Sequence, residues 1–141
     1  MSPLDRAVLA ERGLAVRRHL ERVREKLPAS PDDLSADTDA SDAVILHLWQ
    51  ATQIAIDLAV SASVALGGGP PSTYGDAFKR LVAAGIIDAQ LGARLVKAAG
   101  FRNLVAHAYG RLDMRRVHHA GTTGPADLNA FLAALSEHAT S

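Results

Sequence analysis

The segment from Arg102 to Tyr109 carries four side chains whose types suit chemistry on a phosphodiester. Arg102 offers a permanent charge and a planar fork of N–H donors that matches phosphate. His107 can accept or donate a proton near neutral pH. Asn103 and Tyr109 add an amide and a hydroxyl. Such a set could support transesterification of RNA, in which the ribose 2′-hydroxyl attacks the neighbouring phosphorus. That reaction needs proton transfer and positive charge, and it needs no metal.

The spacing of these residues creates a geometric problem. At about 100° per residue, Arg102 and Tyr109 fall almost on one line of a straight helix, whereas His107 lies roughly 140° from Arg102. Either the helix ends or distorts near Gly110, or a second copy of the chain completes the site across a two-fold axis. We expect that dimerisation helps to bring Arg102 and His107 together.

Each of these residues also has a purely structural explanation. A histidine near a helix end often caps carbonyls, an arginine there often pairs with an acid, and a tyrosine is often half-buried core. Taken singly, the residues are more typical of structure than of catalysis. Their combination is rarer, and it favours a functional interpretation.

The elements that must position this segment are predicted to be helical. Between Leu4 and Leu27, apolar residues recur at intervals of three and four, which indicates a helix with one buried face. Pro28 and Pro31 end that helix, and a loop rich in Asp and Ser follows to Ala40.

The longest helix is expected from Ala43 to Leu66, because this run contains no Gly or Pro and is apolar on more than one face. Ser41 or Asp42 would cap its first amides. The residues 67–71, Gly-Gly-Gly-Pro-Pro, stop it and form a connector. They are not a phosphate-binding loop, because neither a preceding strand nor a Gly-Lys-Ser/Thr ending is present.

A short third helix is expected after Thr73, with Asp76 three residues later in a capping arrangement, and it ends near Gly85. Asp88 then caps a fourth helix, which carries the R-x4-H-x-Y segment. Gly110 marks the exit of this helix.

The remaining chain is predicted to hold a short helical piece over residues 112–119, a break at residues 121–124, and a last helix with Pro125 in its first turn. No run alternates with period two long enough to indicate a strand. The sequence therefore predicts an all-α fold, a bundle of four main helices with short additional helices, as one domain over residues 1–141.

Composition limits the classes of protein that the chain can belong to. Fifteen basic and fifteen acidic residues cancel, so any contact with nucleic acid must be local. The chain has no cysteine, which excludes disulfides and thiolate zinc sites. The N-terminus lacks the apolar stretch of a signal peptide, and no span approaches the roughly 18 apolar residues of a membrane helix. We expect a soluble, cytoplasmic protein without a membrane partner.

The other histidines give no indication of a metal. His118, His119 and His138 could in principle bind one, but adjacent histidines on a helix diverge, and no carboxylate or cysteine stands at ligand spacing. We therefore assign them to the surface, and we assign the chain no metal and no cofactor.

Polar residues on the long second helix are harder to interpret. His47, Gln50, Gln53 and Asp57 are three and four residues apart, so they stack along one side of an otherwise apolar helix. They could line a cleft or a dimer seam, or they could form a buried hydrogen-bonded network. The sequence leaves both possibilities open.

The motif resembles that of a known family. The HEPN superfamily is marked by R-x4-6-H on a helical bundle, and its HepT branch by R-N-x3-H-x-Y, which stands here intact from Arg102 to Tyr109. The flanking segments at residues 53–59, 74–78 and 85–87, and Phe101, also look like that branch. The resemblance spans roughly residues 43–135, and nothing is carried over to the first helix.

This resemblance implies a four-helix up-down bundle and a homodimer with both motifs lining one cleft. It implies a metal-independent endoribonuclease that cuts mRNA or tRNA, in which Arg102 and His107 are catalytic and Asn103 and Tyr109 shape the site. It also implies a type VII toxin–antitoxin pair, in which a minimal nucleotidyltransferase of the MntA kind attaches AMP to Tyr109. Added bulk and negative charge there would repel RNA from Arg102.

Two alternatives keep the helical bundle and change its function. In the first, the protein is a binding subunit that docks to a nucleotidyltransferase and has no catalysis of its own, which the neutral charge balance favours. In the second, it is a helical interaction module in which the motif is only a structural hydrogen-bond cluster. Cleavage of RNA in the presence of a chelator would distinguish the enzyme from both.

Overall fold

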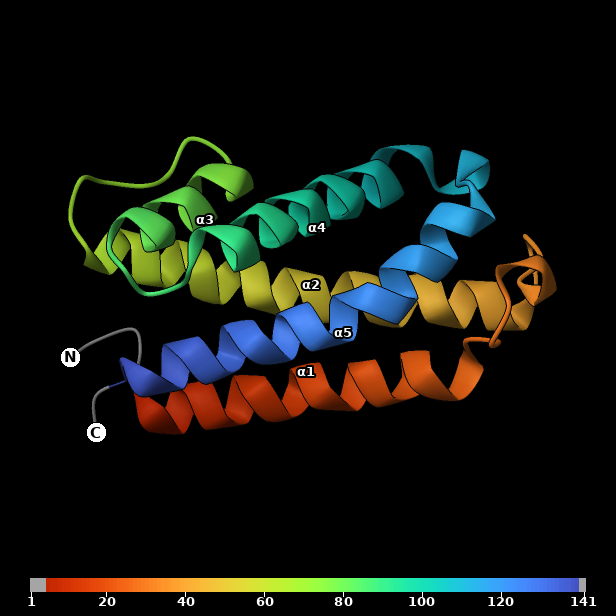
Figure 1. Ribbon diagram of the computed structural model, residues 1–141, viewed down its shortest axis with the longest axis horizontal. Coiled ribbons are helices and arrows are strands. Elements are labelled where there is room, and N and C mark those ends of the chain that lie inside the picture. The colour runs from red at the N-terminus through yellow and green to blue at the C-terminus, as the bar shows by residue number, and fades with distance from the viewer. Residues whose placement is uncertain (1–4, 140–141) are drawn as a thin grey trace.

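Four long helices alternate in direction and form the body of the molecule (Figure 1). The computed structural model describes residues 5–139. Between the second and third long helices lies a short helix, α3, and two single 3-10 turns, η1 and η2, complete the structure. The all-α bundle with small additional helices that the sequence predicts is confirmed. The elements are α1 (Arg6–Lys26), η1 (Pro31–Asp33), α2 (Asp39–Ala65), α3 (Tyr74–Ala83), α4 (Ala89–Ala108), η2 (Tyr109–Arg111) and α5 (Met114–Glu137).

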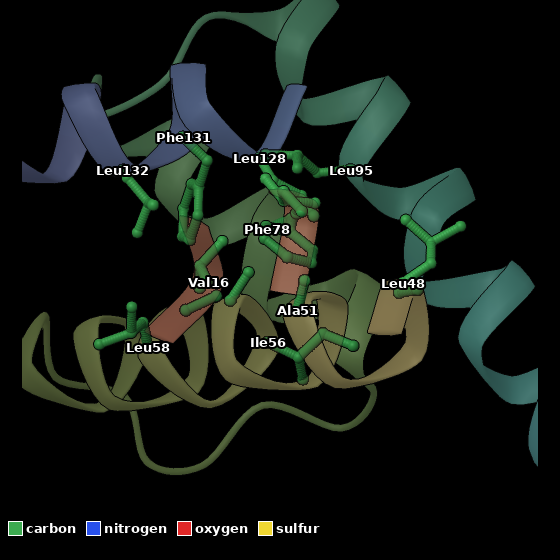
Figure 2. Packing of buried hydrophobic residues seen from close by; sticks show 14 of the residues in the cluster. Val16, Leu48, Ala51, Ile56, Leu58, Phe78, Leu95, Leu128, Phe131 and Leu132 are labelled. Carbon is green, nitrogen blue, oxygen red and sulfur yellow. The ribbon is translucent and has the colours of Figure 1, made fainter. Parts of the chain in front are cut away.

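The hydrophobic core lies around α2, and all five helices contribute to it. Figure 2 shows side chains from α3, α4 and α5 meeting those of α1 and α2. Phe78 and Phe131 are buried and pack edge to face, with ring centroids 5.4 Å apart. Because α2 has buried residues on more than one side, it is the element against which the others are placed.

The starts of the helices are set by capping side chains. Thr73 accepts from the amide of Asp76, and Asp88 from that of Leu91, as predicted. The predicted cap of α2 is wrong. Thr38 caps this helix and Ser41 bonds back to it in a capping box, so α2 begins four residues earlier than expected, at Asp39. The start of α2 is difficult to predict from the sequence, because Asp and Ser are favoured both in loops and in the first turn of a helix.

The predicted break at residues 121–124 is also wrong, because α5 runs without interruption from Met114 to Glu137. Gly121 and Gly124 are contact positions: a Cβ on Gly121 would lie 3.2 Å from Leu27, and one on Gly124 would lie 3.4 Å from Leu48. Pro125 lies inside the helix, and Figure 1 shows that α5 bends along its length, as helices do at an internal proline. The small residues therefore serve close helix packing.

α2 is the one helix in the described part of the chain that is long and apolar enough to cross a membrane, judged by length and composition alone. This differs from the expectation, from the sequence, that no span is apolar enough to cross a membrane. Half of its apolar window is buried inside the bundle, which is typical of the core helix of a soluble protein. We interpret α2 in that way.

The connector before α3 fixes where this short helix sits. Gly67, Gly68 and Gly69 all have φ between 77° and 90°, the left-handed region that favours glycine. The guanidinium of Arg80 donates to the carbonyl oxygen of Gly69 at 2.6 Å and thereby ties the loop to α3. At the start of α3, a Cβ on Gly75 would touch Val96 of α4, so the two helices approach closely.

Candidate functional site

Arg102 lies at the centre of a polar cluster between α2, α3 and α4. Its Nε donates to the Oε1 atom of Gln53 at 2.6 Å, and its Nη1 donates to the Oδ1 atom of Asn103 at 3.1 Å. Gln53 in turn donates to Asp57, one helical turn further along α2, at 2.9 Å. The guanidinium is therefore held by neutral amide oxygens, and in the described residues no carboxylate forms an ion pair with it.

Two aromatic rings flank the same guanidinium. The Cζ atom of Arg102 lies 5.0 Å from the ring centroid of Trp49 and 5.4 Å from that of Tyr74. Both distances are within the range of a cation–π interaction. Trp49 comes from α2 and Tyr74 is the first residue of α3, so three separate helices fix the position of one positive charge.

His107 lies on the exposed surface of α4, about 7.5 Å further along the helix axis than Arg102. Because α4 is continuous to Ala108, the expected angle of roughly 140° between the two side chains applies. No hydrogen bond or ion pair within residues 5–139 engages the His107 imidazole. Within one copy of the chain, the two residues are therefore not brought together.

Tyr109 occupies a different place from Arg102. Its hydroxyl donates to the Oδ1 atom of Asp42 at 2.7 Å, which ties η2 to the first turn of α2. Burial, together with the carboxylates of Asp42 and Asp37, raises the pKa of Tyr109 to about 12. Asp42 is eleven residues from Gln53 on α2, so the Tyr109 hydroxyl and the Arg102 cluster are roughly 16 Å apart along that helix.

The polar residues of α2 divide into two groups. Gln53 and Asp57 belong to the Arg102 cluster and are hydrogen-bonded, but Gln53 is only half buried and Asp57 is exposed, so they do not form the buried network that was one of the two possibilities. His47 lies elsewhere: its Nδ1 is 3.0 Å from the Nδ1 of His19 on α1. In such a contact one ring nitrogen donates and the other accepts, and which does so depends on the tautomers. Burial, followed by the coulombic effect of His47, lowers the pKa of His19. This pair stabilises the contact between α1 and α2.

The C-terminal histidines have local roles. His118 is nearly buried, and its Nε2 lies 2.7 Å from the carbonyl oxygen of Pro28, which contradicts its assignment to the surface. His119 is exposed, as expected. His138 lies 3.0 Å from the carbonyl oxygen of Ala134 near the end of α5. Within the part of the chain that the structure describes, no three His, Asp or Glu side chains gather as metal ligands would.

Three residues of this region are not identified as site residues from the sequence. Trp49 is four residues before Gln53 and therefore on the same side of α2, so helical spacing could have indicated it. Tyr74 stands at the start of a predicted helix and in a segment that resembles the HepT branch, but neither feature gives it a role. Asp42 is 67 residues from Tyr109, and no local pattern signals a pair so far apart.

Comparison with known proteins gives a family and a fold. Residues 16–135 match the model of a family described as ribonuclease HepT-like. No curated protein sequence matches the chain.

Solved structures resemble the chain over nearly its whole length. One is a toxin–antitoxin crystallised with AMP-PNP, at 22% identity and a TM-score of 0.82, over 92% of this chain and 97% of that one. Another is the tri-AMPylated HEPN toxin of Shewanella oneidensis in complex with an MNT antitoxin, at 23% identity and a TM-score of 0.80, over 92% and 96%. At this identity the likeness establishes the fold.

Proposed function

Because the chain belongs to the HepT-like ribonuclease family, we propose that it is the toxin of a type VII toxin–antitoxin pair, a metal-independent endoribonuclease of the cytoplasm. The observation that carries this proposal is the arginine of the motif. Arg102 is fixed by amides and aromatic rings, and no acid neutralises it in the described residues. An arginine held in this way is suited to receive a phosphate.

The free donors of Arg102 define its role. A guanidinium has five N–H groups, and the described contacts use two of them. The remaining donors can bind the nonbridging oxygens of a phosphodiester and stabilise the charge that accumulates as the 2′-oxygen attacks. Asn103 holds the guanidinium by its amide oxygen, which fixes the orientation of these donors.

His107 supplies the proton transfers. It takes the proton of the ribose 2′-hydroxyl while that oxygen bonds to phosphorus, and the bond from phosphorus to the 5′-oxygen breaks as this oxygen gains a proton. The products are one RNA end with a 2′,3′-cyclic phosphate and another with a 5′-hydroxyl. The described imidazole is exposed and unengaged, which supports this assignment.

A second copy of the chain would complete the site. Arg102 and His107 point to different sides of α4, so we infer a homodimer in which Arg102 of one copy faces His107 of the other. Large apolar side chains support this arrangement because they lie exposed on α2 and α4 near the site, among them Leu46 at 50% and Leu104 at 37%. Such residues are typical of a surface that a partner covers.

Tyr109 is the proposed point of control by a nucleotidyltransferase antitoxin of the MntA kind. A structural relative is an AMPylated toxin bound to an MNT antitoxin. The resemblance to the HepT branch assigns such a modification to the motif tyrosine, here Tyr109, whose side chain is partly exposed. The phenol reacts at the α-phosphorus of a nucleoside triphosphate, pyrophosphate leaves, and the phenolic proton passes to a base. The added phosphate would compete with RNA for positive charge.

Replacement of His107 by Ala tests the catalytic assignment. We expect RNA cleavage to fall at least about a hundredfold, because proton transfer contributes at least that factor. The measurement is cleavage of a labelled RNA in excess EDTA, with the chemistry of the new ends determined. His119→Ala, which removes an exposed histidine from α5, is the matched control and should cleave as the parent does.

The alternative of a binding subunit without catalysis predicts another result. If the parent protein leaves RNA intact with and without EDTA, and still binds a nucleotidyltransferase, the ribonuclease proposal is wrong. Cleavage by the His107→Ala protein at the parental rate would also reject the role of this residue.

A further inference from the structure

The aromatic residues of this chain are few and unevenly distributed. There are one Trp, two Tyr and three Phe. Phe78 and Phe131 are buried in the core. Trp49 and Tyr74 are instead only half buried, and both lie against the guanidinium of Arg102. The only tryptophan and one of the two tyrosines thus stand beside the group proposed to bind phosphate.

The helices α2 and α3 place these two rings beside Arg102. Trp49 is one turn before Gln53, so the residue that stacks on Arg102 and the residue that bonds to it come from the same side of α2. Tyr74 reaches the site because Gly75 lets the start of α3 approach Val96 of α4. A Cβ at position 75 would already be in van der Waals contact with Val96, so little space separates the start of α3 from α4.

Aromatic rings beside an arginine that binds phosphate are suited to bind an unpaired base. Bases of single-stranded RNA stack on aromatic side chains and on guanidinium planes. A base inside a duplex has both faces covered by its neighbours, and it cannot use such a site unless it leaves the stack. The guanidinium covers part of both rings, which are half buried, so a base would stack on the parts that remain exposed.

We propose that Trp49 and Tyr74 form a seat for one unpaired nucleobase next to the phosphate bound by Arg102. This inference rests on the proposed function and assigns these two side chains to it. They hold the base and take no part in proton transfer, so they determine which RNA is accepted. The protein then discriminates against RNA in which that base is paired.

The single tryptophan makes binding directly measurable. In the His107→Ala protein, which should bind RNA without cutting it, a short single-stranded oligoribonucleotide is titrated while the fluorescence of Trp49 is recorded. The same strand annealed to its complement is the second ligand. We expect saturable quenching by the single strand, and at least about tenfold weaker binding of the duplex.

Variants at the rings separate stacking from charge. Trp49→Leu and Tyr74→Leu, each combined with His107→Ala, should bind the single strand about tenfold more weakly in a filter or anisotropy assay. Trp49→Phe and Tyr74→Phe keep a ring and should restore most of the affinity. Phe101→Leu is the matched control and should bind as the parent does. It removes a half-buried ring that is next to Arg102 in sequence, whereas the cation–π contacts of Arg102 in the described residues are with Trp49 and Tyr74. Thermal melting of every variant identifies any that has not folded.

Three results would overturn the proposal: equal affinity for single strand and duplex, folded leucine variants with parental affinity, or failure of the His107→Ala protein to bind either RNA. The proposed function is tested separately, by cleavage with the protein that retains His107. Parent protein that binds the single strand through Trp49 without cutting it would refute the nuclease and leave the seat. Cleavage that is unaffected by loss of either ring would support the nuclease and refute the seat.

Discussion

The hydroxyl of Tyr109 resists ionisation, because it is partly buried and donates to the carboxylate of Asp42 at 2.7 Å. Burial and the two nearby acids raise the pKa of the phenol from 10 to about 12. The neutral phenol is thus the form that the folded protein prefers. The folded pKa lies above the unfolded one, so this interaction stabilises the fold fully below pH 10, and the stabilisation is lost as the pH rises from 10 to about 12.

Asp42→Asn tests this electrostatic account. The amide can still accept a hydrogen bond but carries no charge, so the pKa of Tyr109 should fall from about 12 towards 10. The measurement is the ultraviolet absorbance of phenolate across an alkaline titration. Subtraction of the titration of Tyr109→Phe isolates this phenol from that of Tyr74. An unchanged pKa in Asp42→Asn would mean that burial and Asp37 cause the shift without Asp42.

The imidazole pair between α1 and α2 gives a second dependence on pH, in the acid range. The pKa of His19 lies below 6.5, because burial and His47 both oppose its charge. The unfolded chain therefore binds a proton more readily, so the fold loses stability as the pH falls below about 6.5. His47→Ala should weaken this loss. Denaturant unfolding at pH 7.5 and pH 5 measures the change in the free energy of unfolding. If this change is the same in the parent and in His47→Ala, His47 does not contribute to it.

At the scale of the elements, glycines decide how closely the helices approach. Gly92 of α4 faces α3, and a Cβ there would lie 2.3 Å from the Cγ2 atom of Val82. Valine in a helix has little rotational freedom, so the methyl cannot easily move aside. Gly100 lies on the same helix, and a Cβ there would meet nothing within 4 Å.

These two positions make a matched pair of substitutions. Gly92→Ala should lower the free energy of unfolding by about 1–3 kcal/mol, because the clash outweighs the better helix propensity of alanine. Gly100→Ala should raise it by about 0.5–1 kcal/mol, because only the propensity changes. Chemical denaturation of both proteins gives the comparison. Equal stabilisation by both would show that α3 and α4 are less closely packed than described.

The helix boundaries show which parts of the fold could be predicted from the sequence alone. Apolar spacing predicted the long helices, and Thr73 and Asp88 were identified as caps, since such signals lie within a few residues of one another. The continuity of α5 has no local signal, because Gly121 and Pro125 normally interrupt helices, and the contact of Gly121 with Leu27 comes from a distant part of the chain. The bond from Tyr109 to Asp42 joins distant segments and has no local signal.

The motif, too, could be predicted from the sequence only in part. Arg102 and His107 were identified from residue type and spacing, and their divergence on α4 followed from helix geometry. Which side chains would hold the guanidinium depended on the packing of α2 and α3 against α4. No spacing rule supplies that packing, so Trp49 and Tyr74 could not be assigned a role from the sequence.

At the scale of the whole molecule, a site shared between two copies can be tested by mixing inactive subunits. If each site takes Arg102 from one copy and His107 from the other, a dimer of Arg102→Ala with His107→Ala has one intact site. Random exchange makes half of the dimers mixed, so activity should return to about one quarter of the parental value.

The control for this experiment is each inactive protein alone, treated in the same way. RNA cleavage after unfolding and refolding the mixture is the measurement, and analytical ultracentrifugation establishes that dimers have formed. A mixture that stays as inactive as its components would place both residues in a single subunit.

The short helix α3 has a consequence for how such a protein could diversify. Its first residue, Tyr74, follows an exposed glycine connector and lies where α3 approaches α4 closely, whereas Gln53 and Trp49 belong to the central helix of the core. Insertions or deletions in that connector would shift Tyr74 and leave the long helices, with the contacts of Gln53 and Trp49 to the guanidinium, in place. Descendants of one ancestor could acquire new RNA preferences in this way without rebuilding the catalytic pair.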